Sequence, residues 1–448
     1  MKYSIIITLI LCSLTAVLDP AVGHATPYGK YNQGHLEWQV TETKHFRFYS
    51  TPESQNTLAY LTQIADDTFE RLNVFYGWQP KDKIKVTVLG YTSYANGFAE
   101  YSKERITIFP TAPDFHNRSR KPWLEGVFTH ELSHIISLNV STHWLSQMPL
   151  FLMNGLSRAG DHVQMSFKLP LFGPNLPHWY KEGIAQFDTW LLERDDYDEN
   201  RRAYQRASIE DDTFYPMAKL AFFGGEKWYN TGFGFLIYLE KRFGAGTVHK
   251  VAKALGESYY FVFENVFEKV TGVPFEELEE DFRTRAQASY TAHRMSTEDG
   301  AYDGQPLRIE KQDTRYTELS ADQKEYEGKH YRLTPLRYAQ GKLYFKRYGA
   351  VHHADFNQET LELTNIKRIG SAKSFGPRTN DSYLILKNEG SSPSLIPSFH
   401  RQDFESASIF AVDEDGTETL LLSESRLMAI DTCASRKEIA GVYNEKGL

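Results

Sequence analysis

Residues 130–134 read His-Glu-Leu-Ser-His, a pattern that could place two imidazoles and a carboxylate around one metal ion. On a helix, His130 and His134 are four positions apart and therefore share a face, one turn apart. Catalytic zinc takes three protein ligands and leaves one position for water. Glu131 lies beside the histidines, where its carboxylate could take a proton from that water.

A helix over 123–137 must hold these residues. Its hydrophobic residues recur at helical spacing and predict a buried face on the side away from the chemical groups. That face consists of Leu124, Phe128, Leu132, Ile135 and Ile136.

A third ligand is offered by Glu182, in the segment 177–186. Glu182 opens a helical pattern that is otherwise apolar, and a carboxylate beside a buried face usually has a partner. The alternative is a first-turn glutamate that only interacts favourably with the helix dipole.

Together, His-Glu-Leu-Ser-His and the Pro-x-Trp-x-x-Glu-Gly-x-Ala segment resemble the gluzincin metallopeptidases, and in particular the bacterial peptidase MA-like group. The likeness covers residues 45–295. It implies an α+β fold with a thermolysin-like two-lobe peptidase domain, one Zn²⁺ per chain held by His130, His134 and Glu182, and Glu131 as general base. It also implies a strand that holds the substrate by main-chain hydrogen bonds, for which Arg105–Phe109 is the candidate. The alternative for Arg105–Phe109 is a plain strand of the sheet.

Two departures from the gluzincin pattern stand out. His134 and Glu182 are 48 residues apart (182 − 134), which predicts an insertion near the site. Relatives often carry an acidic residue four positions after the glutamate ligand, and here that residue is Gln186. An amide can accept a hydrogen bond from an imidazole but adds no charge, so it would lower ligand basicity.

Relatives also place a tyrosine before a glycine-containing helix, where its hydroxyl stabilises the oxyanion. Tyr229 is the candidate for this role and Tyr238 is the alternative. A phenol donor of this kind could contribute a few kcal/mol to stabilising the transition state.

An aminopeptidase would further need an acidic residue for the substrate amine. Glu100 is the candidate, although its context does not match the aminopeptidase motif.

The chain has 448 residues, 41% hydrophobic and 24% charged, which is typical of a globular protein of two or three domains. A net charge of −8 argues against nucleic acid as a partner. Residues 1–25 predict a bacterial secretory signal, with Lys2, an apolar stretch over 5–18 and a cut after Ala25, so the protein would be periplasmic or extracellular. Cys12 lacks a good lipobox, which argues against lipidation. Cys433 is the only cysteine after the predicted cut, so no disulfide within the mature chain is expected.

The predicted organisation follows these motifs. Residues 26–138 form an α/β lobe that ends in the metal helix, with Asn96-Gly97 as a turn between two strands. Residues 139–176 are an apolar insertion, interpreted as a lid, a membrane-surface contact or a hairpin packed on the second lobe. Within or beside it, His143, His162 and His178 are predicted surface or core residues, and His178 could reach the substrate. Residues 177–298 form a helical lobe.

Residues 299–448 change to short strands separated by turns. Turn-then-strand units recur at Tyr344, Leu384 and Ile439, which predicts propeller-like blades that are incomplete in number. These blades loosely resemble the WD40-like propeller protein of the Tol system. The function predicted is hydrolysis of peptide or protein substrates by a secreted zinc metallopeptidase. The alternative is a non-catalytic envelope scaffold that binds a partner through the propeller-like domain.

Overall fold

The computed structural model describes residues 37–298, 308–309 and 337–443, apart from the following gaps: 91–94, 113–120, 148, 157–163, 171–175, 211, 221–225, 261, 340, 348–349, 361, 373, 378–382, 389–406, 414–415, 426 and 434–437. The predicted signal segment, its cut after Ala25 and His162 lie outside the described residues. No helix among the described residues is long and apolar enough to span a membrane.

A mixed five-stranded sheet opens the described chain, in the order β1-β2-β3-β5-β4. Its strands are β1 (Gln39–Glu42), β2 (Phe46–Ser50), β3 (Ile84–Val88), β4 (Ala95–Glu100) and β5 (Arg105–Pro110). Strand β3 is buried at every second residue, which is the pattern expected when one face of a sheet packs on a core. Helix α2 (Gln55–Tyr76) crosses between β2 and β3 and ends at Gly77, whose φ of 68° suits a left-handed cap.

One expectation about this sheet is wrong, and one pair of alternatives is decided by the strand pairing. Asn96 and Gly97 do not form a turn but lie inside β4, paired with Phe109 and Ile108 of β5. Strand β5 is an internal strand, as the plain-strand alternative for Arg105–Phe109 predicts, because it pairs with β3 on one side and β4 on the other. Its main-chain groups are therefore used by the sheet. Among the described strands, the edge next to α3 is β4.

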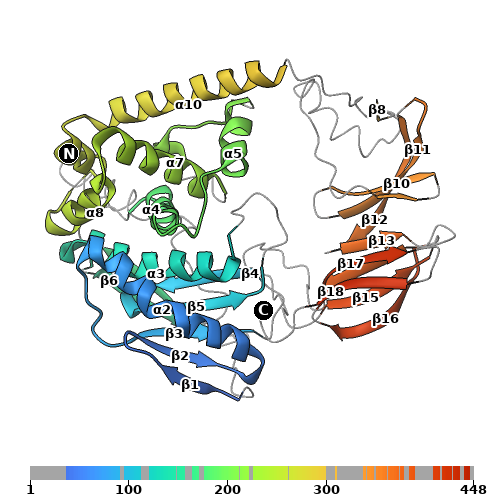
Figure 1. Cartoon of the computed structure of the whole chain (residues 1–448), viewed down its shortest axis with the longest axis horizontal. Coiled ribbons are helices and arrows are strands. Elements are labelled where there is room, and N and C mark those ends of the chain that lie inside the picture. The colour runs from blue at the N-terminus through green and yellow to red at the C-terminus, as the bar shows by residue number, and fades with distance from the viewer. Residues whose placement is uncertain are drawn as a thin grey trace, which may run out of the picture.

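The helix predicted around His-Glu-Leu-Ser-His is α3 (Trp123–Ser141), which lies between the sheet and the helical part of the molecule (Figure 1). The apolar face predicted from the sequence is buried throughout. Helix α3 packs on α2 and β4 on one side and on α4 and α8 on the other, which gives it a solid core contact on each side. The metal helix is thus the central element of a single core cluster.

The insertion contains an antiparallel hairpin, formed by β6 (Pro149–Leu156) and β7 (Gln164–Pro170). This agrees with the hairpin interpretation at the level of the backbone. Its side chains lie outside the description, so its proposed roles as a lid or a membrane contact stay predictions.

The chain continues as a group of helices, on the other side of α3 from the sheet (Figure 1). They are α4 (His178–Leu191), α5 (Glu199–Glu210), α6 (Met217–Leu220), α7 (Glu226–Phe243), α8 (Thr247–Glu257), α9 (Asn265–Thr271) and α10 (Phe275–Glu298). Helices α4 and α7 cross at two glycines. A Cβ on Gly232 would lie 2.0 Å from the carbonyl oxygen of Trp179, and a Cβ on Gly183 would lie 2.7 Å from the carbonyl carbon of Gly232. Only glycine permits so close an approach of the two backbones.

The C-terminal region is all-β, as predicted. Strands β8 (Arg308–Ile309), β9 (Arg337–Ala339), β10 (Lys342–Arg347), β11 (Ala350–Asn357) and β12 (Glu362–Ser371) form one sheet. Strands β13 (Ser374–Pro377), β14 (Tyr383–Asn388), β15 (Ala407–Val412) and β16 (Glu418–Ser425) form a second, and β17 (Leu427–Cys433) pairs with β18 (Glu438–Tyr443). The three repeated strands are β10, β14 and β18, each the second of its antiparallel unit. The described strands make open sheets, without a closed propeller ring among them.

Candidate metal centre

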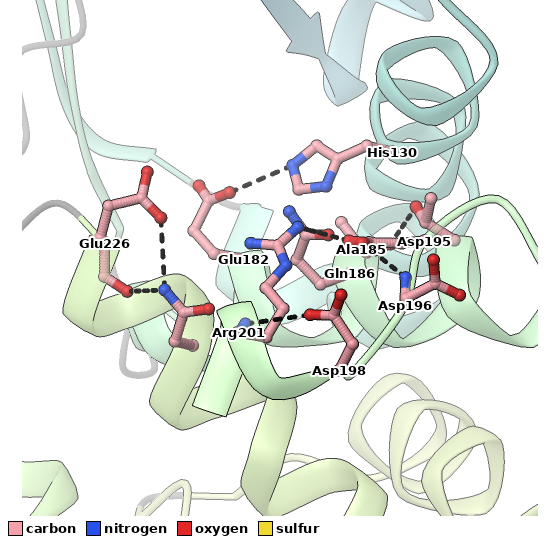
Figure 2. Close-up of polar contacts among 11 residues, drawn as sticks. His130, Glu182, Ala185, Gln186, Asp195, Asp196, Asp198, Arg201 and Glu226 are labelled. Atoms are coloured by element: carbon pink, nitrogen blue, oxygen red, sulfur yellow. Dashed lines mark hydrogen bonds and ion pairs between the residues drawn. The ribbon is translucent and has the colours of Figure 1, made fainter. Parts of the chain in front are cut away.

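Three predicted ligands converge between α3 and α4. Nε2 of His130 and Nε2 of His134 lie 3.1 Å apart, and each is 3.3 Å from Oε2 of Glu182. Within the described part of the chain, these three residues form a group that could hold a metal ion. Figure 2 shows the Glu182 carboxylate directed at His130.

The spacing of the three atoms fits zinc. Bonds of about 2.0–2.1 Å in a tetrahedral site put ligand atoms about 3.3–3.4 Å apart, close to the separations seen here. Oε2 of Glu182 is buried and makes no hydrogen bond to any described residue. A buried carboxylate oxygen in that state is costly unless a cation approaches it. The donor set, two imidazoles and one carboxylate, is one that catalytic zinc sites use.

The charges at the site support one another. Burial acts to raise the pKa of Glu182, but His134 and His130 outweigh it and hold the pKa well below its usual range. Burial acts to lower the pKa of His134, but Glu182 and then Glu131 raise it overall. The pocket therefore favours a negative carboxylate facing positive charge. A metal cation would take the place of the imidazole protons, because ligating histidine must be neutral.

Glu131 and Tyr229 lie beside the triad. Glu131 is only 6% exposed and faces β4, where a Cβ on Gly97 would meet its Oε1 at 2.6 Å. The Tyr229 ring lies 5.9 Å from the His130 ring, so the structure brings it to the site. Tyr229 is part of helix α7, whereas the sequence pattern predicted it ahead of that helix.

The other predicted residues do not join the triad. Tyr238 donates to Asp281 at 2.6 Å and is also bonded to Arg242, which removes it as the alternative to Tyr229. Glu100 pairs with Lys103 at 2.7 Å and with Arg105 at 3.5 Å, so surface cations already engage its carboxylate.

Gln186, at the position where relatives carry the partner of a histidine ligand, contacts an arginine instead. Gln186 is buried, and its Oε1 accepts a hydrogen bond from Nη2 of Arg201 at 3.3 Å. The same nitrogen pairs with Asp195 at 2.5 Å (Figure 2). This ion pair is 2–3% exposed, and the sequence did not reveal it because Arg201 lies in a stretch rich in charges.

A second polar cluster, also not predicted, involves the same two helices, α3 and α4. Ser133 donates to Oδ2 of Asp188 at 2.5 Å, and Tyr76 donates to the same oxygen at 2.8 Å. His249 contacts Oδ1 at 3.1 Å. Asp188 is fully buried and joins α2, α3, α4 and α8. One signal was present in the sequence: a carboxylate inside the apolar pattern of α4 needs partners.

Two predicted surface or core histidines lie near the site. The His178 ring stacks on Trp228 with centroids 4.5 Å apart, one residue before Tyr229. His143 lies near Tyr259, beyond the end of α3. Neither contributes an atom to the three-residue metal group among the described residues.

No family model matches the chain, and no curated protein matches it. Similar solved structures include a hydrolase, an aminopeptidase and a zinc metallopeptidase. Native yeast LTA4 hydrolase is 10% identical, over 55% of this chain and 38% of its own, with a TM-score of 0.34. Aminopeptidase A of Legionella pneumophila, in complex with aspartic acid, is 11% identical, over 55% and 28%, with a TM-score of 0.31. A mutant M1 zinc metallopeptidase of Deinococcus radiodurans, bound to a Tyr-Ser-Ala substrate, is 15% identical, over 55% and 51%, with a TM-score of 0.31.

The chain thus aligns with less than two thirds of the length of each of these proteins. We therefore assign the site from its own geometry.

Proposed function

We propose that the protein is a zinc-dependent metallopeptidase that hydrolyses peptide bonds. One observation carries the proposal: two imidazole nitrogens and a carboxylate oxygen converge to 3.1–3.3 Å, with a second buried glutamate beside them. That arrangement provides three ligands, an open position and a base within one small volume.

His130, His134 and Glu182 would hold the ion. Bound zinc would polarise the scissile carbonyl and lower the pKa of water from about 15.7 toward about 7. The Glu131 carboxylate would take the proton from the attacking water and later deliver it to the leaving amine. Tyr229, whose ring lies 5.9 Å from the His130 ring, would donate its hydroxyl to the developing oxyanion.

Strand β4 takes over the substrate-holding role expected of Arg105–Phe109. It is the edge strand on the side of α3, and its outer main-chain groups could pair with an extended peptide. Gly97 keeps that strand close to Glu131. A peptide on β4 would therefore run past both the proposed base and the metal ligands.

The remaining predictions complete the proposal. The protein would bind one Zn²⁺, be exported to the bacterial periplasm or beyond, and act on peptides or proteins. Residues 139–176 would contact the substrate or a membrane surface. Residues 299–448 would form propeller-like blades, incomplete in number, built from their successive antiparallel units. These blades would contact an envelope partner.

Elemental analysis and one activity assay test the proposal. We expect about one zinc per purified chain, lost in Glu182→Ala and kept in Glu210→Ala, which removes an exposed glutamate. Glu131→Gln should keep zinc and lose hydrolysis of a casein or peptide-library substrate. Full activity in Glu131→Gln would refute the mechanism. Absence of zinc after reconstitution would instead favour the scaffold alternative.

A further inference from the structure

A small cavity lies beside the metal centre, at the C-terminal end of α3. Its volume is about 90 Å³, and its lining combines aromatic and aliphatic groups with a few polar ones. Leu138 and Ser141 line it from α3, Lys181 from α4, and Tyr260 from the segment after α8. None of its lining residues, all of which are described, is an aspartate or glutamate.

The cavity lies further along the face of α3 that carries the two histidines. Leu138 and Ser141 are eight and eleven residues after His130, so they continue the face of α3 that carries both histidines. At 1.5 Å per residue, they lie about 6–10 Å beyond His134 along the helix. Tyr101, which follows β4, lines the same cavity, and its carbonyl accepts a hydrogen bond from Asn139 at 2.9 Å. The proposed substrate strand and the cavity therefore meet.

Two polar groups in the lining have no protein partner among the described residues. Lys181 is partly buried, and its ammonium makes no hydrogen bond or ion pair within the described part of the chain. The Tyr260 hydroxyl is buried and also makes no hydrogen bond there. The negative charge of the neighbouring Glu182 favours the charged form of Lys181, but the two side chains make no ion pair within the described part of the chain, and Oε2 of Glu182 faces the two histidines. A partly buried cation and a buried hydroxyl that lack hydrogen-bond partners are costly unless a ligand supplies an acceptor.

From this we infer that the cavity is a subsite for a carboxylate of the substrate, with the Lys181 ammonium and the Tyr260 hydroxyl as its donors. The inference rests on the proposed peptidase function. An extended peptide advances about 3.3 Å per residue, so the carboxylate would lie two or three residues from the scissile bond. It could be an acidic side chain or the terminal carboxylate of a short peptide. Both supply the same acceptor group.

The test compares matched peptides. Fluorescein-labelled alanine–serine octapeptides with blocked ends would carry one glutamate, moved position by position, and a second set would carry glutamine instead. A third set would carry glutamine and a free C-terminal carboxylate. Affinity would be measured by fluorescence anisotropy on zinc-loaded Glu131→Gln, and kcat/KM on the wild type. The variants are Lys181→Met, Lys181→Arg and Tyr260→Phe, each checked for unchanged zinc content.

We expect one glutamate position to be preferred over glutamine by about tenfold or more, as for a hydrogen-bonded charge. Lys181→Met should abolish the preference, Tyr260→Phe should reduce it and Lys181→Arg should retain it. A preference seen only in the third set would assign the site to the terminal carboxylate. Equal affinities in all sets, or no binding of any peptide, would overturn the subsite. Selective binding to Glu131→Gln without cleavage by the wild type would overturn the peptidase function alone.

Discussion

Gly97 of the edge strand is in direct contact with Glu131 of the metal helix, since a Cβ on Gly97 would lie 2.6 Å from Oε1 of that glutamate. Gly97→Ala should therefore displace the Glu131 carboxylate. We expect kcat to fall by about one to two orders of magnitude, as for a shift near 1 Å, and stability to drop by about 1–3 kcal/mol through overpacking.

The control for this prediction is Gly126→Ala on the same helix as the ligands, where the nearest atom, the carbonyl oxygen of Arg194, is 3.3 Å away. Its kcat should stay within about twofold of wild type, because the atom that has to shift slightly belongs to a main-chain carbonyl and not to a reacting side chain. Steady-state kinetics and zinc analysis would be measured on both variants. Normal kcat in Gly97→Ala would show that the contact does not position the base.

The Tyr229 hydroxyl is expected to act only in the transition state. Tyr229→Phe should lower kcat by about 100-fold with little change in KM, because a donor aimed at the oxyanion stabilises the transition state selectively. Tyr238→Phe is the matched control, since that hydroxyl bonds Asp281 instead. A larger effect of Tyr238→Phe on kcat, at equal zinc content, would reverse the assignment.

Asp188 should matter for folding more than any exposed acid. Asp188→Asn removes a buried charge that accepts from Ser133 and Tyr76 and contacts His249. Loss of a buried hydrogen-bond acceptor costs about 1–3 kcal/mol for each donor left without a partner, so urea unfolding should shift strongly. Asp281→Asn breaks ion pairs with Arg242 and Arg285 at the surface, which is expected to cost less than about 1 kcal/mol. Equal shifts would mean that the buried cluster is not a structural centre.

Alkaline pH should unfold the protein through its buried phenols. Burial, reinforced by Asp188, raises the pKa of Tyr76 well above its usual value of 10. Burial also raises the pKa of Tyr197 to about 12. Because the folded-state pKa values are the higher ones, this stabilisation is complete below pH 10 and is lost as pH rises from 10 toward 12.

Each such tyrosine should lower the free energy of unfolding by about 1.4 kcal/mol per pH unit in that range. Tyr197→Phe removes one of these tyrosines and should reduce the slope by that one contribution, at the loss of only a 3.4 Å hydrogen bond to Gln205. Urea unfolding at successive pH values measures the slope, and the part of the tyrosinate absorbance that comes from the buried phenols should appear together with unfolding. An unchanged slope in the variant would contradict the assignment.

The structure brings together the three side chains that the sequence offered as metal ligands, and their role as ligands stays a prediction. The i, i+4 spacing placed His130 and His134 on one face of α3, and the resemblance to the gluzincins added Glu182. The hydrophobic face and the helix end at Gly77 were equally readable. The position of Tyr229 depended on the glycine-containing pattern of α7, and the structure places its ring near His130.

Other features could not be read in this way because they depend on distant contacts. Asn96-Gly97 carries a strong turn signal, but pairing with β5 overrides it and makes the pair part of the edge strand. The partners of Asp188 come from three other helices, and no spacing along one segment reveals them. Likewise, the burial of Arg201 results from helix packing that a polar local sequence conceals.

The glycine crossing of α4 and α7 has a consequence for protein engineering. Glu182 precedes Gly183, and Tyr229 is one turn before Gly232, so the distance between a metal ligand and the proposed oxyanion donor is set by main-chain contact. Transplanting the histidines and glutamates onto another scaffold would not transfer that distance. A designer who wished to move this chemistry would have to copy the crossing itself, glycines included, before choosing any of the reactive side chains.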